Sequence, residues 1–124
     1  VVNTASLCGF AGQFDGLQDL HERFGDRALI LAVPSNDFAQ ELASEAEVKE
    51  YCTMTFGITL PMTEITPVRG AQAHPFYAWV RDETGFVPGW NFNKVLIGPD
   101  GEIAGTFGSA VPPESDRIAG AIQA

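Results

Sequence analysis

The apolar run from Ala28 to Val33, which Pro34 ends, constrains the fold of this chain more than any other feature. Six consecutive apolar side chains leave a strand no polar face, so both faces of the sheet around it must be covered. Strands of this kind belong to α/β sheets in which helices pack on either side. We therefore predict that residues 28–33 form a central strand of an α/β fold.

Helices are predicted before and after this strand. Apolar residues recur at helical spacing over residues 14–24, and Gly25 is expected to end that helix in left-handed backbone. Further along, Ser44 with Glu47 three residues later is a capping-box pattern. A second helix should therefore begin there and stop at Gly57.

The remaining segments complete the order of elements. An apolar start at Val1 predicts a first strand, and Pro75 suits the first position of a third helix. A hairpin is predicted over residues 92–107, with its turn at residues 98–101, and a last helix over residues 113–123. This order predicts a parallel βαβ unit followed by an antiparallel ββα unit. Such a layout is a thioredoxin-like fold: one domain with a central mixed sheet flanked by helices.

The charge balance excludes several classes of partner. The chain has 16 acidic and 7 basic residues and a formal net charge of −9, which would repel nucleic acid and anionic lipid. No apolar run approaches the roughly 20 residues that cross a bilayer. The two cysteines and the two histidines, Cys8, Cys52, His21 and His74, lack metal-site spacing. We expect no nucleic acid partner, no membrane insertion, no metal and no organic cofactor.

Cys8 lies where the first strand runs out and before the first helix begins. There its sulfur would face helix N-terminal amides, which favour the reactive thiolate. Gly9 and Gly12 are typical of a loop in which the backbone adopts unusual angles. From the residues alone, two interpretations stay open, because free cysteines are often inert packing residues.

Four short blocks around Cys8 share their order with one known family. They are Asn3-Thr4-Ala5-Ser6-Leu7-Cys8-Gly9, Pro34-Ser35-Asn36-Asp37-Phe38, Ala73-His74-Pro75 and Trp90-Asn91-Phe92-Asn93-Lys94. Together they resemble the glutathione peroxidase family across nearly the whole chain. Relative to that family, the first strand is shortened and an N-terminal hairpin is absent, so we expect the N-terminus to be incomplete.

The resemblance implies catalytic roles for three residues. Cys8 would be the peroxidatic residue, and Trp90 and Asn91 would donate hydrogen bonds to its thiolate and to the peroxide oxygens. Neutral donors held in place stabilise the charge that builds on the leaving oxygen when the O–O bond breaks. Taken alone, Trp90 reads as a core aromatic residue and Asn91 as a turn residue. Their register with Cys8 favours the catalytic interpretation.

Asp37 departs from the resemblance, because the family carries a glutamine donor at that position. An ionised carboxylate accepts hydrogen bonds but cannot donate them, and near Cys8 it would repel a thiolate. Three alternatives follow: Asp37 is protonated, it is turned away to bond a backbone amide, or Gln40 supplies the missing amide. The second and third are favoured, because aspartate in a polar turn commonly bonds backbone N–H groups.

Cys52 is the candidate resolving residue, which would attack the sulfenic acid on Cys8 and form a disulfide. In two-cysteine members of the family, however, the resolving residue aligns with Thr53. A shift of one position turns a helical side chain by about 100°. Cys52 is therefore either the resolving cysteine or a buried core residue.

The resemblance implies a thiol peroxidase that reduces H2O2 and organic hydroperoxides. Family members with a segment as short as Pro61 to His74 tend to use thioredoxin and to be monomeric. We therefore expect thioredoxin or glutathione as the reductant, and a soluble monomer of the cytoplasm or periplasm. One rival is a redox-sensing or binding module without turnover, which Asp37 favours. A disulfide exchange protein is disfavoured, because the chain has no C-x-x-C pair.

Overall fold

The protein is seen in a computed structural model, which describes residues 1–123. Four strands and four helices follow one another in the described chain. In chain order they are β1 (Val2–Thr4), α1 (Gln13–Phe24), β2 (Ala32–Pro34), α2 (Glu45–Phe56), α3 (Pro75–Thr84), β3 (Lys94–Ile97), β4 (Ile103–Phe107) and α4 (Asp116–Gln123).

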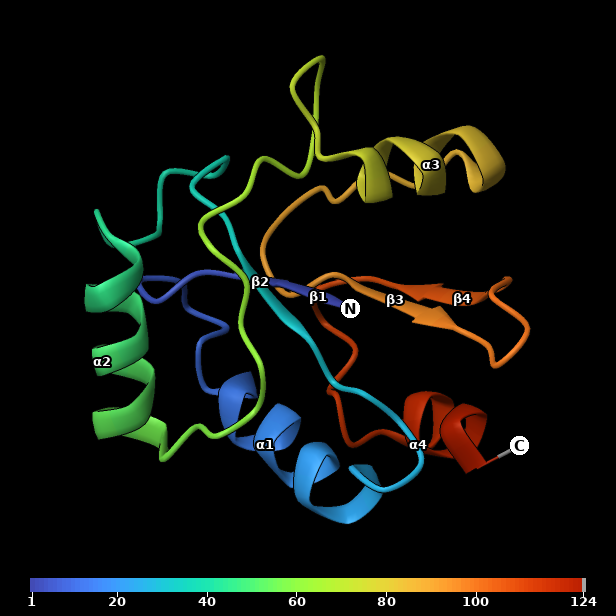
Figure 1. The fold of residues 1–124 in the computed structure, drawn as a ribbon, viewed down its shortest axis with the longest axis horizontal. Coiled ribbons are helices and arrows are strands. Elements are labelled where there is room, and N and C mark those ends of the chain that lie inside the picture. Colours follow the sequence, from blue (N-terminus) through green and yellow to red (C-terminus); the bar gives the residue numbers. More distant parts are fainter. Residues whose placement is uncertain (124) are drawn as a thin grey trace.

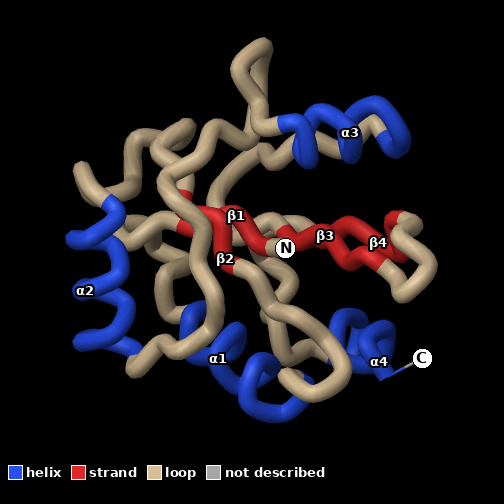
Figure 2. Tube along the Cα trace, in the orientation of Figure 1, coloured by secondary structure: helices blue, strands red, loops and turns tan. Residues whose placement is uncertain are grey.

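The strands form one mixed sheet in the order β2-β1-β3-β4. β1 pairs with β2 in parallel, whereas β3 runs antiparallel to both β1 and β4. Helices α1 and α4 lie on one side of the sheet and α3 lies on the other, with α2 beside α1 (Figure 1). Figure 2 shows how much of the chain between these elements is loop. The predicted thioredoxin-like arrangement is confirmed.

The prediction of a central strand over residues 28–33 is wrong in two respects. β2 contains only Ala32–Pro34, and it lies at the edge of the sheet rather than in its middle. The paired register begins at Ala32, opposite Val2, the first residue of β1. The Leu31 carbonyl accepts the N–H of Val2 at 3.0 Å, but residues 28–31 are not part of the strand. On the outer side of β2, an isolated bridge joins Ala32 to Met62. The apolar run predicted correctly that part of this segment is buried, but it did not predict which of its residues pair with a neighbouring strand.

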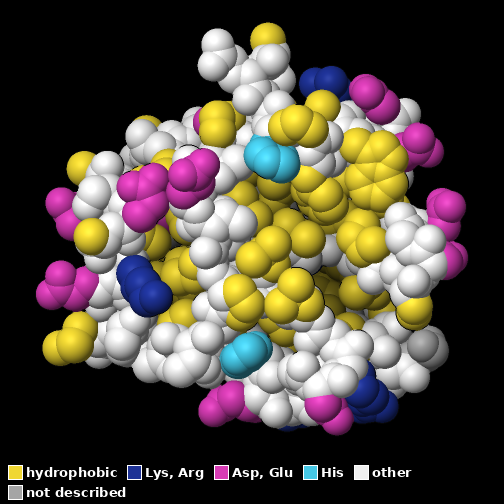
Figure 3. Space-filling view, viewed as in Figure 1, with side chains coloured by type: hydrophobic (Ala, Val, Ile, Leu, Met, Phe, Trp, Pro, Cys, Tyr) yellow, Lys and Arg dark blue, Asp and Glu magenta, His cyan; other side chains and the backbone are white. Residues whose placement is uncertain are grey.

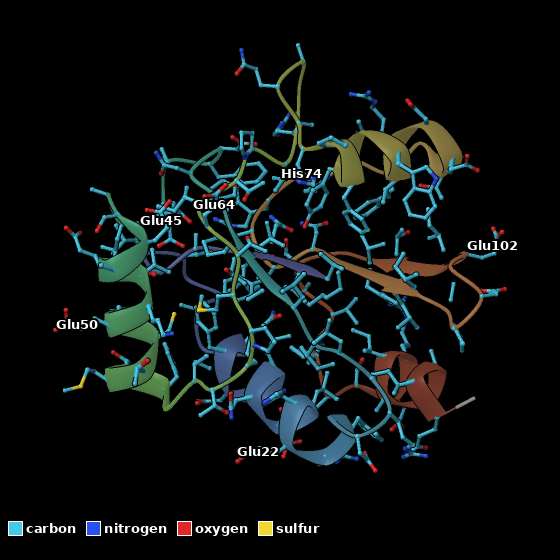
Figure 4. The ribbon with its side chains drawn as sticks, viewed as in Figure 1. Glu22, Glu45, Glu50, Glu64, His74 and Glu102 are labelled. Carbon is cyan, nitrogen blue, oxygen red and sulfur yellow. The ribbon has the colours of Figure 1, made fainter. Side chains whose placement is uncertain are left out.

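Helix ends follow the local sequence signals at α2 and α3 but not at α1. The Ser44 side chain accepts the N–H of Glu47, and Gly57 ends α2 in left-handed backbone with a φ of 63°. His74 caps the start of α3 with its side chain (Figure 4). Gly25, in contrast, is right-handed with a φ of −60°, because the chain continues from α1 directly into a further turn.

An apolar hollow of about 590 Å³ opens between the sheet and the helices α1 and α4. Figure 3 shows apolar side chains gathered over the middle of one face of the molecule. The residues that line the hollow include Val1, Leu17, Leu29, Leu96, Phe107 and Ile122, and none from the loop that carries Cys8. Within residues 1–123, no helix is long and apolar enough to cross a membrane.

Candidate active site

Cys8 lies in the loop of residues 5–12, which joins β1 to α1, and its side chain is 6% exposed. The backbone N–H of Phe10 donates to Cys8 Sγ at 3.4 Å, and the N–H of Ala11 donates to the Cys8 carbonyl at 3.0 Å. The amide that faces the sulfur therefore belongs to the loop and not to the helix, because α1 begins only at Gln13.

The base of the Cys8 loop is held by a second segment, residues 36–42, which follows β2. The N–H of Leu7 donates to the Gln40 carbonyl at 2.8 Å. The N–H of Ser6 donates to Glu41 Oε1 at 3.1 Å. These two contacts fix the loop immediately before the cysteine.

Asn91 joins this group from the far end of the sequence. Its side chain is fully buried, and its Nδ2 donates to Gln40 Oε1 at 3.2 Å. Its Oδ1 is buried and has no partner among the described residues. The bond from Asn91 uses the side-chain oxygen of Gln40. It therefore leaves both Nε2 hydrogens of Gln40 free of this contact. Two side-chain amides thus meet beside the segment that holds the Cys8 loop.

Asn3 of β1 holds the Trp90–Asn93 block in place, although the sequence analysis gave it no role. Its Nδ2 donates to the Trp90 carbonyl at 2.9 Å, and its Oδ1 accepts the N–H of Asn93 at 3.1 Å. The N–H of Phe92 donates to the Asn3 carbonyl at 2.6 Å, and Phe92 adopts a φ of 62°. The same strand therefore leads into the Cys8 loop and anchors the block with Asn91. The signal in the sequence was an asparagine directly after two valines in a predicted strand, where a buried amide would need hydrogen-bond partners.

Trp90 lies next to Asn91 and is 37% exposed. Its indole ring packs against Phe38 of the 36–42 segment, with 5.3 Å between ring centroids. Two apolar neighbours of Cys8 are also exposed, Leu7 to 60% and Phe10 to 37%. Apolar side chains are therefore available to solvent on either side of the cysteine in sequence and on the Trp90 block.

Asp37 does not join the group that contains Gln40 and Asn91. Its Oδ2 accepts the backbone N–H of Val68 at 2.7 Å and that of Arg69 at 3.0 Å. This is the arrangement of the second alternative, in which the carboxylate bonds backbone amides elsewhere. Gln40 contacts Asn91, the other candidate donor, so the third alternative stays a prediction.

Cys52 is fully buried in α2, and both cysteines are free thiols. Burial raises the pKa of the Cys52 thiol to about 11, and the negative charge of Glu41 adds to this effect. The nearby Ser6 side chain lowers this pKa to a smaller extent. Cys52 therefore lies beneath the base of the Cys8 loop, in an environment that disfavours its thiolate.

Lys94 is a buried cation at the first position of β3. Its Nζ donates to Gln13 Oε1 and to the Val111 carbonyl, each at 2.6 Å. Burial lowers the pKa of Lys94 to about 8. With these bonds the side chain ties β3 to the start of α1 and to the loop that follows β4. No group of three or more metal-ligating side chains occurs in the described part of the chain.

Comparisons with known proteins agree on one family. A family model described as glutathione peroxidase matches residues 1–81. The chain is 42% identical over 120 residues to a protein of Lactococcus lactis named "Glutathione peroxidase", with 92% of this chain and 76% of that protein covered. It is 38% identical over 138 residues to "Hydroperoxy fatty acid reductase gpx1" of Synechocystis, covering 99% and 79% of the two chains.

Two further matches extend this result. The chain is 33% identical over 144 residues to "Thioredoxin/glutathione peroxidase BtuE" of Escherichia coli, covering 95% of this chain and 79% of that protein. A solved structure described as "Crystal structure of Trgpx in apo form" superposes with a TM-score of 0.71 at 32% identity, covering 98% and 78% of the two chains.

Proposed function

The chain belongs to the glutathione peroxidase family and is a thiol peroxidase of that kind, and we propose that the thiolate of Cys8 performs its chemistry. The observation that supports this most is the convergence of three distant segments: the Cys8 loop, the 36–42 segment with Gln40, and the block with Asn91. Nucleophilic attack on a peroxide needs a thiolate and, near it, donors for the departing oxygen.

In the proposed first step, Cys8 Sγ attacks one oxygen of a hydroperoxide, the S–O bond forms and the O–O bond breaks. The other oxygen leaves with the electron pair, takes up a proton, and departs as water or an alcohol. Cys8 is thereby oxidised to a sulfenic acid. We assign the stabilisation of the leaving oxygen to the side-chain amides of Asn91 and Gln40 and to the indole N–H of Trp90.

In this proposal Gln40, and not the residue at position 37, supplies the side-chain amide that donates to the leaving oxygen. Gln40 bonds Asn91 through its oxygen, which leaves its two Nε2 hydrogens for the substrate. Asp37 uses its carboxylate on two backbone amides at residues 68 and 69. The substitution at Asp37, the main argument for a sensor without turnover, therefore does not remove the donor that the reaction needs.

In the second step, a thiol attacks the Cys8 sulfenic acid, which gives a disulfide and water, and a second thiol then restores Cys8. We propose thioredoxin as the reductant, with glutathione second. A relative from Escherichia coli carries both in its name. The first thiol is either that of the external reductant or Cys52. The Cys52 route needs local opening of α2, because that thiol is fully buried.

We propose that the substrates include apolar organic hydroperoxides as well as H2O2. Leu7 and Phe10 flank Cys8 in sequence, and they are exposed together with Trp90. Solvent-facing apolar side chains at a reactive group favour the binding of an apolar substrate tail. A relative at 38% identity is named a hydroperoxy fatty acid reductase.

Stopped-flow measurement of peroxide consumption tests the proposal. We expect wild type to turn over H2O2 and an alkyl hydroperoxide with thioredoxin, and Cys8→Ser to consume neither above the uncatalysed rate. If wild type and Cys8→Ser are equally slow with both thioredoxin and glutathione, the peroxidase mechanism is wrong. If Cys52→Ser keeps full turnover, Cys52 is a core residue and the external thiol attacks Cys8 directly.

A further inference from the structure

Glu41 is a buried carboxylate next to Gln40, and the reaction described above gives it no role. Its residue surface is 8% exposed. Its Oε1 accepts two backbone N–H groups, from Ser6 at 3.1 Å and from Leu42 at 2.8 Å. Its own N–H donates to Asn36 Oδ1 at 3.2 Å. The side chain thus belongs to the 36–42 segment by its backbone and to the Cys8 loop by its carboxylate.

The contact with Ser6 is one of a pair. Leu7, the next residue, donates its N–H to the carbonyl of Gln40, the residue before Glu41. Two consecutive amides of the loop are therefore held by two consecutive residues of the 36–42 segment. The pair ends one residue before Cys8, so it fixes the direction in which the chain enters the cysteine.

Burial of this carboxylate is costly in free energy, because its second oxygen, Oε2, has no partner within residues 1–123. An apolar residue of similar size would avoid that cost. The same carboxylate also acts on the other cysteine, since its charge contributes to the raised pKa of Cys52. A group that is costly to bury and that bonds a backbone amide of the Cys8 loop is better explained by the placement of that loop than by stability.

We propose that Glu41 is a positioning residue for the peroxidase reaction: its Oε1 holds the Cys8 loop at the distance and angle at which the sulfur and the Gln40 amide act on one peroxide. This inference rests on the proposed function. Glu41 touches neither the substrate nor the sulfur. It acts through the Ser6 amide, so that an acceptor at Oε1 is required and a negative charge is not.

The test compares Glu41→Leu, which keeps the bulk and loses the acceptor, with Glu41→Gln, which keeps an acceptor oxygen and loses the charge. Both are made in the full chain with Cys52→Ser, so that only Cys8 reacts. Glu50→Gln is the matched control, because Glu50 points outward from α2 (Figure 4). Circular dichroism and denaturant unfolding establish that each variant is folded.

Two rates of Cys8 are measured on each variant: oxidation by H2O2 in stopped flow, and alkylation by iodoacetamide at the same pH. Alkylation needs the thiolate but not the donors for a leaving oxygen. We expect Glu41→Leu to slow oxidation by about tenfold or more while alkylation changes by less than about twofold. The reason is that a small misplacement of the reacting groups lowers the rate of the oxidation step strongly. Glu41→Gln should recover oxidation to within about threefold of wild type, and Glu50→Gln should match wild type in both rates.

The proposal is overturned if Glu41→Leu oxidises as fast as wild type, or if its two rates fall in proportion, which would show general loosening of the loop. It is also overturned if Glu41→Gln is as slow as Glu41→Leu, since charge would then be the requirement. Should Glu41→Leu fail to fold, the same comparison is made with Glu41→Met. A wild type without Cys8-dependent oxidation overturns the proposed function itself, whereas a fast wild type with an equally fast Glu41→Leu overturns only the role of Glu41.

Discussion

The surroundings of Cys8 and Cys52 differ in kind, although both thiols are buried and belong to the same core cluster. Cys8 lies in a loop with a backbone N–H at its sulfur, and exposed apolar residues lie next to it. Cys52 lies on the inner face of a regular helix, near a buried carboxylate. Two buried thiols therefore differ in what faces the sulfur: a backbone N–H at Cys8 and a negative charge near Cys52.

The largest effect is expected from removing the side-chain amide of Asn91, which we propose to act on the peroxide at Cys8. Asn91→Ala should slow the oxidation of Cys8 by H2O2 by about 10²–10³-fold, the usual loss of one preorganised donor. Stopped-flow rates in excess peroxide measure it. Asn91→Asp keeps the size and one oxygen but removes the donor, so it should be equally slow. An Asn91→Asp variant as fast as wild type would show that Asn91 donates nothing to the reaction.

The next effect concerns the reactivity of the other thiol. In a Cys8→Ser background, alkylation of Cys52 should reach half its maximum near pH 11, because burial and Glu41 raise its pKa from an ordinary value near 9.0. At pH 8 the thiolate fraction is then about 100-fold below that of the same thiol in denaturant. Iodoacetamide rates across the pH range measure both states. A half-maximum near pH 9 in the folded protein would remove the contrast between the two cysteines.

The same shift predicts how stability depends on pH. The folded pKa of Cys52 lies above its unfolded value, so the folded state keeps a proton that the unfolded state releases between pH 9 and 11. Stability that Cys52 contributes below pH 9 is therefore lost as pH rises to 11, by up to about 2 kcal/mol. We expect the difference in unfolding free energy between wild type and Cys52→Ala to narrow by this amount. Urea titrations at several pH values measure it.

The titration of Lys94 changes stability with pH in the opposite direction. This effect should be measurable once Cys52 is replaced. Burial holds its folded pKa near 8, below its ordinary value of 10.5, so the unfolded state binds the extra proton between these values. Stability should accordingly rise with pH from 8 to 10.5 in Cys52→Ala. If that variant loses stability over this range, the Lys94 amine is better solvated than its position indicates.

The smallest effect separates the two residues that compete for one role near Cys8. Gln40→Ala should slow Cys8 oxidation by about tenfold, because it removes an amide and leaves Asn91 without its partner. Asp37→Ala should change that rate by less than twofold and instead lower the unfolding free energy by about 1 kcal/mol, since two backbone amides lose their acceptor. Stopped-flow oxidation rates and urea unfolding are measured on both variants. If Asp37→Ala oxidises slowly, Asp37 and not Gln40 takes part in the reaction.

The order of the elements and the caps of α2 and α3 could be predicted because the signals are local. Ser44, Gly57 and His74 each act on backbone within a few residues. The position of β2 could not be predicted, because it depends on where Val2 of another strand begins to pair. Periodicity reports burial, whereas pairing requires a partner that the segment does not itself specify.

The candidate site divides in the same way. Short blocks sufficed to nominate Cys8, Asn91 and Trp90 as candidates, and the structure brings Asn91 into contact with Gln40, another candidate. Asn3 and Glu41 were missed, because each acts by holding backbone that is far away in sequence. An asparagine directly after two valines in a predicted strand, as at Asn3, is the signal that would have found part of this scaffold.

The bonds of Asn3 join residues that stand 87 and 90 positions apart along the chain. Closing so long a stretch is entropically unfavourable until many other contacts exist, so these bonds should form late in folding. On the proposed function, Cys8 would then come together with the Trp90 and Asn91 donors only when the last hairpin docks against the first strand. A chain arrested before that event, or nicked between the two, would carry a sulfhydryl with the nonselective reactivity of a small peptide.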